Sequence, residues 1–213
     1  MIKRIWSMIL NHVKNNIKTY FALTLAFIIG LSAGAFTVNG LSTVQREELV
    51  NYFKGFLQLI NGQSIDSGEL LKASLYDNIK IIAVLWILGV TIIGIPFIYL
   101  IIGIRGFITG FTSGFIIEAI GYKGIIFTLL ALLPKEILII PCILALGVNG
   151  INFSLDIIKN KSIKHISKEN LRTSLLAYCF VTLFYSGLII PGILTEAYIT
   201  PTIIKLIAPV IIK

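Results

Sequence analysis

The residues best placed to do chemistry are Pro134, Lys135 and Glu136, which interrupt a long apolar run over residues 125–148. A charged side chain at membrane depth is costly, so each charge needs a protein partner or a water-filled cavity. Neighbours on a helix point about 100° apart, so Lys135 and Glu136 do not neutralise each other. Two interpretations follow: a contact site for a substrate, a proton or a partner helix, or a structural kink whose charges face the bundle interior.

The composition indicates the kind of protein that must position this triplet. Of 213 residues, 56% are hydrophobic and 13% are charged, and the mean hydropathy is +0.93. Soluble domains contain about 25% charged residues. We therefore predict an all-α, polytopic transmembrane helical bundle of about five to six spans, with kinked and short helices. It should form a single integral-membrane domain over residues 1–213.

The apolar runs give the expected spans and the points where they bend. Pro96 and Pro141 lie inside two of them and should kink the helices, because proline removes an i→i−4 hydrogen bond. We expect Arg105 to end the second span. The expected spans are residues 20–38, 79–104, 107–120, 125–148 and 174–190, followed by a short apolar piece at 202–212.

A glycine ladder precedes the charged triplet. Gly106, Gly110 and Gly114 recur at four-residue spacing, with Gly103 just upstream. Small residues at this spacing let two helix backbones approach closely in a membrane. The ladder predicts tight helix packing, either within the chain or between two copies of it.

The charged segments between the spans predict the topology. Residues 1–18 and 149–171 are rich in Lys and Arg. The positive-inside rule then makes them an amphipathic cytoplasmic helix and a basic cytoplasmic loop, in a multi-pass protein of the cell membrane with a cytoplasmic N-terminus. The same rule explains the net charge of +8 without nucleic acid. A re-entrant fold at Pro134 would move the 149–171 loop outside, so we expect a kinked but complete crossing.

Residues 39–78 form the largest polar segment, and we expect it to be helical and extracytoplasmic. It is the only segment that could build a sizeable water-exposed surface, so partner contacts are expected there and at the outer ends of the spans. The candidate contact residues are Glu47, Glu48, Phe53, Phe56, Glu118 and Glu196.

No catalytic constellation can be assembled from the sequence. Neither His12 nor His165 has a ligand or base at a useful spacing, and Cys142 and Cys179 both lie in apolar segments. No metalloprotease, serine-hydrolase or P-loop motif is present. We therefore expect no enzyme, no metal and no cofactor.

Several short segments, in order along essentially the whole chain, resemble the stage II sporulation protein M family. They are residues 94–99 (GIPFIY), 103–111 (GIRGFITGF), 132–137 (LLPKEI) with Pro141 downstream, and 196–201 (EAYITP). One position departs from the pattern. Where the family often has His-Gly or a polar amide pair after the proline, this chain has Lys135 and Glu136.

The resemblance implies a role in endospore formation. It suggests a scaffold in the mother-cell membrane that localises two peptidoglycan-degrading partners during engulfment, stage II sporulation proteins D and P, one an amidase and one a lytic transglycosylase. The broader family also looks permease-like. The alternative is therefore a transporter subunit that works with a separate ATPase, which would couple at residues 149–171.

Overall fold

The computed structural model describes residues 10–62, 66–162 and 168–212, and the regular structure in these ranges is helical throughout. Five helical stretches within them are long and apolar enough to cross a membrane. They are Ile17–Asn39, Ser67–Val90, Gly94–Ile120, Tyr122–Lys159 and Arg172–Ile207. The predicted all-α transmembrane bundle is confirmed.

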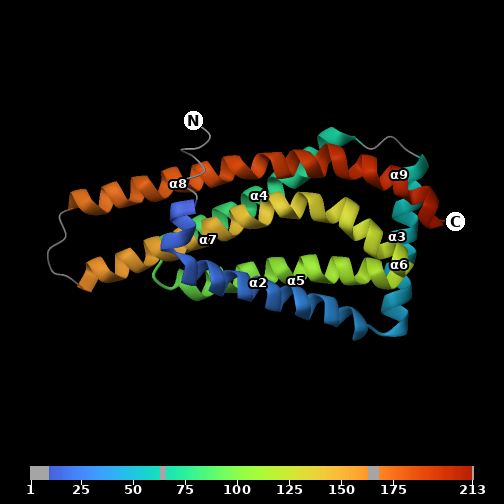
Figure 1. Cartoon of the computed structure of the whole chain (residues 1–213), viewed down its shortest axis with the longest axis horizontal. Helices are drawn as coiled ribbons and strands as arrows, with labels where there is room; N and C mark the ends of the chain where they lie inside the picture. Colours follow the sequence, from blue (N-terminus) through green and yellow to red (C-terminus); the bar gives the residue numbers. More distant parts are fainter. Residues whose placement is uncertain (1–9, 63–65, 163–167, 213) are drawn as a thin grey trace.

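The long helices lie side by side along the molecule, and α3 crosses one end of them (Figure 1). We call this the α3 end; it also holds α6 and α9. The start of α2, the turn between α4 and α5, the end of α7 and the start of α8 lie at the opposite end. The elements in chain order are α2 (Ile17–Asn39), α3 (Thr43–Gly62), α4 (Ser67–Val90), α5 (Gly94–Ile120), α6 (Tyr122–Phe127), the π-helix η1 (Thr128–Leu132), α7 (Leu133–Ser162), α8 (Lys168–Leu194), the π-helix η2 (Thr195–Ile199) and α9 (Thr200–Ile212).

The boundaries predicted for the second and third spans are wrong. The chain turns at residues 91–93, so α4 ends at Val90 and α5 runs unbroken from Gly94 to Ile120. Pro96 therefore lies in the first turn of α5 and does not kink a span, because backbone N–H groups in a first turn have no intrahelical partner to lose. Arg105 lies in the middle of α5 and ends no span.

The turn between α4 and α5 requires a residue without a side chain at Gly94. A Cβ atom there would lie 1.8 Å from the Leu88 carbonyl oxygen. The turn is also fixed from α7, because the Ser154 hydroxyl donates a hydrogen bond to the Thr91 carbonyl oxygen.

The fourth and fifth spans each contain a π-helical turn followed by proline. Pro134 comes two residues after η1, and Pro201 comes two residues after η2. A π turn widens the helix, which accommodates a residue that cannot donate a backbone hydrogen bond. Residues 122–159, which include η1, form a single candidate span, as the predicted complete crossing requires. Residues 202–212 belong to α9, which continues the fifth span through η2.

Glycines bring α2 and α5 into backbone contact, and the two helices run side by side (Figure 1). A Cβ on Gly106 would lie 2.2 Å from the Phe27 carbonyl oxygen, and one on Gly110 would lie 2.0 Å from that of Leu31. Four-residue steps on both helices keep this register, which identifies a parallel pair. The other glycines of this interface with such close approaches are Gly30 and Gly34 of α2.

The four glycines of the predicted ladder are not equivalent. Gly114 faces Ala35, with a Cβ-to-Cα distance of 3.1 Å, and so belongs to the same contact as Gly106 and Gly110. A Cβ on Gly103 would stay 3.6 Å from its nearest neighbour, the Ala26 carbonyl oxygen. The glycine ladder therefore packs against another helix of the same chain. Gly103, at one end of the ladder, is the position that has room for a side chain.

This difference gives a matched pair of substitutions on one helix. Gly110→Ala should lower the stability of the bundle by about 1–3 kcal/mol, because the new methyl group meets rigid backbone. Gly103→Ala should be neutral or stabilising by up to about 1 kcal/mol, since alanine favours the helix. Thermal unfolding of both purified variants in detergent measures this, and equal melting temperatures would contradict the assigned interface.

Candidate functional site

Four charged side chains from three elements meet inside the bundle, and we call them the charged cluster: Arg105, Lys135, Glu136 and Glu196. Glu136 of α7 accepts from Arg105 of α5, with Nη2 lying 3.2 Å from Oε1 and 3.4 Å from Oε2. Lys135 forms an ion pair with Glu196 of η2. The two neighbours on α7 thus turn to different partners, and the cluster carries no net charge.

A hydroxyl group joins a fourth element to the charged cluster. Ser74 of α4 is buried, and its Oγ donates to Oε2 of Glu196 over 2.6 Å. Both oxygens of Glu196 are therefore engaged, one by Lys135 and the other by Ser74. A single carboxylate holds α4 and α7 together at η2.

Burial makes these pairings costly to break. The side chains of Arg105 and Glu136 are only 18% and 12% exposed, and those of Lys135 and Glu196 are 16% and 27% exposed. Removing one partner of a buried ion pair leaves an uncompensated charge, at a cost of about 3–5 kcal/mol. The cluster is therefore a clamp between helices.

The two π turns lie against each other beside the charged cluster. The Thr200 hydroxyl donates to the Ala131 carbonyl oxygen over 3.2 Å, which joins α9 to η1. Ala131 and Ala197 are both fully buried, and their small side chains permit this close approach. Lys135 comes three residues after η1 and Glu196 lies in η2, and the two side chains pair with each other beside this contact.

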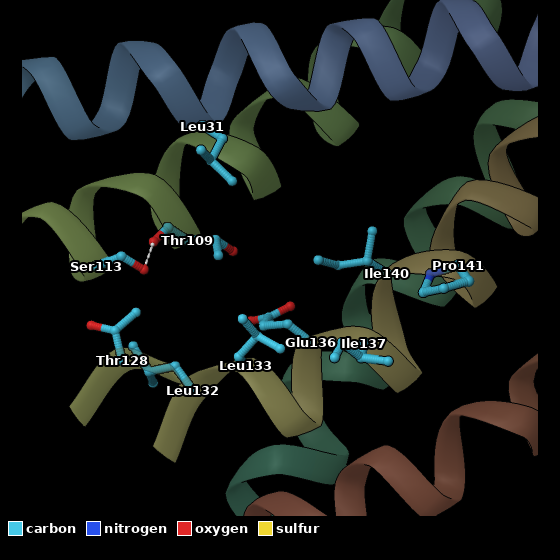
Figure 2. Close-up of a pocket in the computed structure, with 10 residues that line it drawn as sticks. All are labelled: Leu31, Thr109, Ser113, Thr128, Leu132, Leu133, Glu136, Ile137, Ile140 and Pro141. Atoms are coloured by element: carbon cyan, nitrogen blue, oxygen red, sulfur yellow. Dashed lines mark hydrogen bonds between the residues drawn. The ribbon is translucent and has the colours of Figure 1, made fainter. Parts of the chain in front are cut away.

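A cavity of about 440 Å³ lies next to the cluster, between α5, η1 and α7, with Leu31 of α2 at its edge (Figure 2). We call it the Glu136 cavity. Its polar lining consists of Thr109, Ser113, Thr128 and Glu136. The Ser113 hydroxyl donates to the Thr109 carbonyl oxygen over 2.8 Å, whereas the Thr128 hydroxyl oxygen is buried and has no hydrogen-bond partner.

Three of the predicted contact residues are engaged within the chain. Glu196 belongs to the charged cluster, and Glu118 accepts from Arg46 of α3 over 2.7 Å. Phe53 is buried, with its ring 6.0 Å from that of Phe115 and 5.7 Å from that of Phe127. These side chains fasten α3 and η2 to the bundle, and of the three only Glu118 is exposed.

The remaining contact candidates lie on α3. Glu47 and Glu48 are exposed. Phe56 lies in α3, but its side chain is outside the described part of the structure. No three His, Cys, Asp or Glu side chains come together as a metal site would need in the described ranges.

Ser74 and Thr128 were not predicted as site residues from the sequence, and Arg105 was predicted to end a span. A first-turn signature was present in Gly94-Ile95-Pro96, since proline favours the start of a helix. Reading a helix start there would have moved Arg105 into the middle of a span, where it must find a carboxylate. Ser74 and Thr128 carry no comparable signal, because membrane helices commonly contain Ser and Thr.

A comparison with known families decides what kind of protein this is. The model of the family described as "Stage II sporulation protein M" matches residues 6–201. The chain belongs to the stage II sporulation protein M family. No curated protein and no solved structure is significantly similar to it.

The match makes this chain a sporulation-related multi-pass membrane protein. The matched residues include all four members of the charged cluster and the whole lining of the Glu136 cavity. This member of the stage II sporulation protein M family thus has its interhelical clamp in the part of the chain that defines the family.

The buried ion pair predicts a non-additive pair of substitutions. Lys135→Met should destabilise this family member by about 3–5 kcal/mol, because Glu196 loses its counter-charge inside the bundle. Adding Glu196→Gln should recover most of that loss. Thermal unfolding in detergent of the two single variants and the double variant measures the coupling.

The exposed pair Arg46–Glu118 serves as a control, since its side chains are 39% and 37% exposed. Solvent-exposed pairs contribute about 0–1 kcal/mol. Arg46→Met and Glu118→Gln should therefore have small, nearly additive effects. If the Lys135 and Glu196 variants were equally additive, the clamp would be refuted.

Proposed function

We propose that the chain is a non-catalytic scaffold of endospore engulfment in the mother-cell membrane, which localises the peptidoglycan-degrading stage II sporulation proteins D and P. Membership of the stage II sporulation protein M family supports the sporulation context. The partners come from the family resemblance. The fold adds an exposed helix, α3, which lies across one end of the bundle and could serve as a platform for partners.

The platform is the observation on which the proposal depends. Helix α3 lies across the end of the bundle (Figure 1) and is fastened there by Phe53 and Leu57, both buried against the spans. Its opposite face exposes Glu48 and Tyr52, and the Tyr52 side chain is 77% exposed. A helix that is already folded and packed in this way can bind a partner without the cost of ordering it first.

The charge distribution supports an orientation with α3 outside the cell membrane. Lys14, Lys18, Lys159 and Arg172 are exposed at the opposite end of the bundle. Basic residues concentrate on the cytoplasmic side of membrane proteins. The N-terminus is then cytoplasmic, and α3 faces the compartment that contains peptidoglycan.

A transporter subunit working with a separate ATPase is the second candidate. The Glu136 cavity favours it, since a cavity among transmembrane helices with a carboxylate in its lining suits a substrate path. The pairing of Lys135 and Glu136 with Glu196 and Arg105 favours the scaffold, because both charges already have partners in the chain.

The scaffold proposal is tested by neutralising the exposed face of α3. The variant Glu47→Gln, Glu48→Gln, Tyr52→Ala should insert normally but fail to bring fluorescently tagged proteins D and P to the engulfing membrane, because its surface contacts are gone. Fluorescence microscopy of sporulating cells measures recruitment, and immunoblotting of membranes checks abundance. Asp156→Asn, an exposed acid at the opposite end, is the matched control.

Normal recruitment by the α3 variant would remove this face from the proposal. The double variant Lys135→Met, Glu196→Gln separates the two candidate functions. A scaffold should still recruit its partners when the clamp is replaced by a neutral pair. Loss of sporulation with normal folding and normal recruitment would favour transport.

A further inference from the structure

Helix α4 carries an exposed pair of charges at membrane depth. Asp77 and Lys80 form an ion pair over 3.6 Å, and their side chains are 70% and 53% exposed. The helix is apolar from Ile81 to its end at Val90. Lys80 therefore lies about 15 Å from that end, half the thickness of a bilayer core of about 30 Å. Lipid cannot solvate these charges, so they need a protein partner.

The two charges lie on the face of α4 that points away from the bundle. The opposite face is buried, at Ser74, Asn78, Leu85 and Gly89. Exposed residues recur on the outward face at alternating steps of three and four, which is the spacing of the a and d positions of a coiled-coil seam. We call this stripe the α4 seam: Ala73, Tyr76, Lys80, Ala83, Ile87 and Val90.

The side chains of the α4 seam suit contact with another helix. Ala73 and Ala83 are small, which lets a second backbone approach closely in lipid. Tyr76 and Ile87 are large and lie between and beyond them, with exposed fractions of 63% and 56%. The α4 seam thus alternates small and large residues along a line that no element of the described chain covers.

The charges beside the α4 seam identify which helix fits. Lys72 and Asp77 flank the seam on opposite sides, five residues apart, and both are exposed. None of the ion pairs in the described ranges involves Lys72. In a parallel pair of such helices, a flanking residue lies opposite the partner's residue five positions further on, and ion pairs there set partner and orientation. A second α4 therefore places its Asp77 opposite Lys72.

Lys80 lies on the α4 seam itself and would meet its counterpart in the second copy. Its charge is compensated within its own chain, because Nζ lies 3.8 Å from the centroid of the Tyr76 ring and 3.6 Å from Oδ1 of Asp77. A single lysine at a seam position lowers stability but fixes the register. One step earlier on the same line, Glu69 lies in the first turn of α4, at the edge of the span, where water and salt screen like charges.

The membrane determines how two copies can meet. Both insert in the same orientation, so a twofold axis along the membrane normal pairs α4 with α4 in parallel, and the same surface serves on both copies. We propose that the chain forms a homodimer through the α4 seam, with Lys72 of each copy paired to Asp77 of the other. This interface does not involve α3, and the inference does not depend on the proposed scaffold function.

Cysteine cross-linking tests the contact. The full chain with Cys179→Ser, which leaves only the buried Cys142, is reconstituted in phosphatidylethanolamine–phosphatidylglycerol vesicles at low protein content. On oxidation, Ala73→Cys should form a disulfide-linked dimer, because the two copies of this position face each other. Leu75→Cys is the matched control, since Leu75 is 42% exposed on the same turn of α4 but lies off the seam. It should stay monomeric on a non-reducing gel.

Charge reversal tests the ion pairs. Energy transfer between donor- and acceptor-labelled copies in the same vesicles measures dimerisation as the protein content is raised. Lys72→Glu should weaken the dimer roughly tenfold, because it replaces two attractions with two repulsions. Lys159→Glu makes the same change at an exposed position on another helix and should leave the dimer unchanged. Both variants should keep the wild-type melting temperature in detergent.

Energy transfer no higher than that of randomly mixed monomers would overturn the proposal. So would equal cross-linking of Ala73→Cys and Leu75→Cys, or dimerisation that Lys72→Glu leaves unchanged. If Ala73→Cys cross-linked in cells to a different protein and not to a second copy, the α4 seam would belong to another partner. These vesicles contain no partner proteins, so the result is separate from recruitment through α3.

Discussion

The cost of placing a charge in lipid organises the centre of this bundle. Lys135 and Glu136 cannot pair with each other, so each selects a partner from another element. Because the pairs are buried, losing one member costs more than the pair itself contributes. The arrangement thus specifies which helices may be neighbours: α5 must bring Arg105 to α7, and η2 must bring Glu196. Ser74 adds α4 to the same requirement.

The glycine contact between α2 and α5 performs a complementary task. It involves no charge and works through the absence of side chains at Gly106 and Gly110, which lets the backbones touch. Its close packing fixes α5 against the first span, so Arg105 is presented to Glu136 from a rigid support. Helix α3 then rests on this assembly through Phe53, which contacts residues of α5 and α6. The position of α3 therefore depends on the packing of the spans beneath it.

Much of this could be predicted from the sequence. The composition predicted the helical bundle, and the apolar run around Lys135 and Glu136 predicted that each charge needs its own partner. The identity of the partners could not be predicted, because Arg105 was assigned to a span end. The apolar character of residues 79–104 shows no dip at residues 91–93, where the chain actually turns. A tight turn built on Gly94 needs no polar residues, so hydropathy alone does not reveal it.

The prolines and the charges are best understood as one unit. In lipid, a proline leaves a backbone carbonyl without its usual donor, and no water is present to compensate. Each of the two affected spans places a π turn just before one of its prolines, Pro134 in one and Pro201 in the other. Across the contact between these turns, the Thr200 hydroxyl donates to the carbonyl oxygen of Ala131. Lys135 follows η1 and Glu196 lies in η2, so their ion pair joins the two spans beside these turns. The ion pair thus joins two irregular segments, η1 and η2. The positions of its two charges in turn depend on the backbone geometry of these segments.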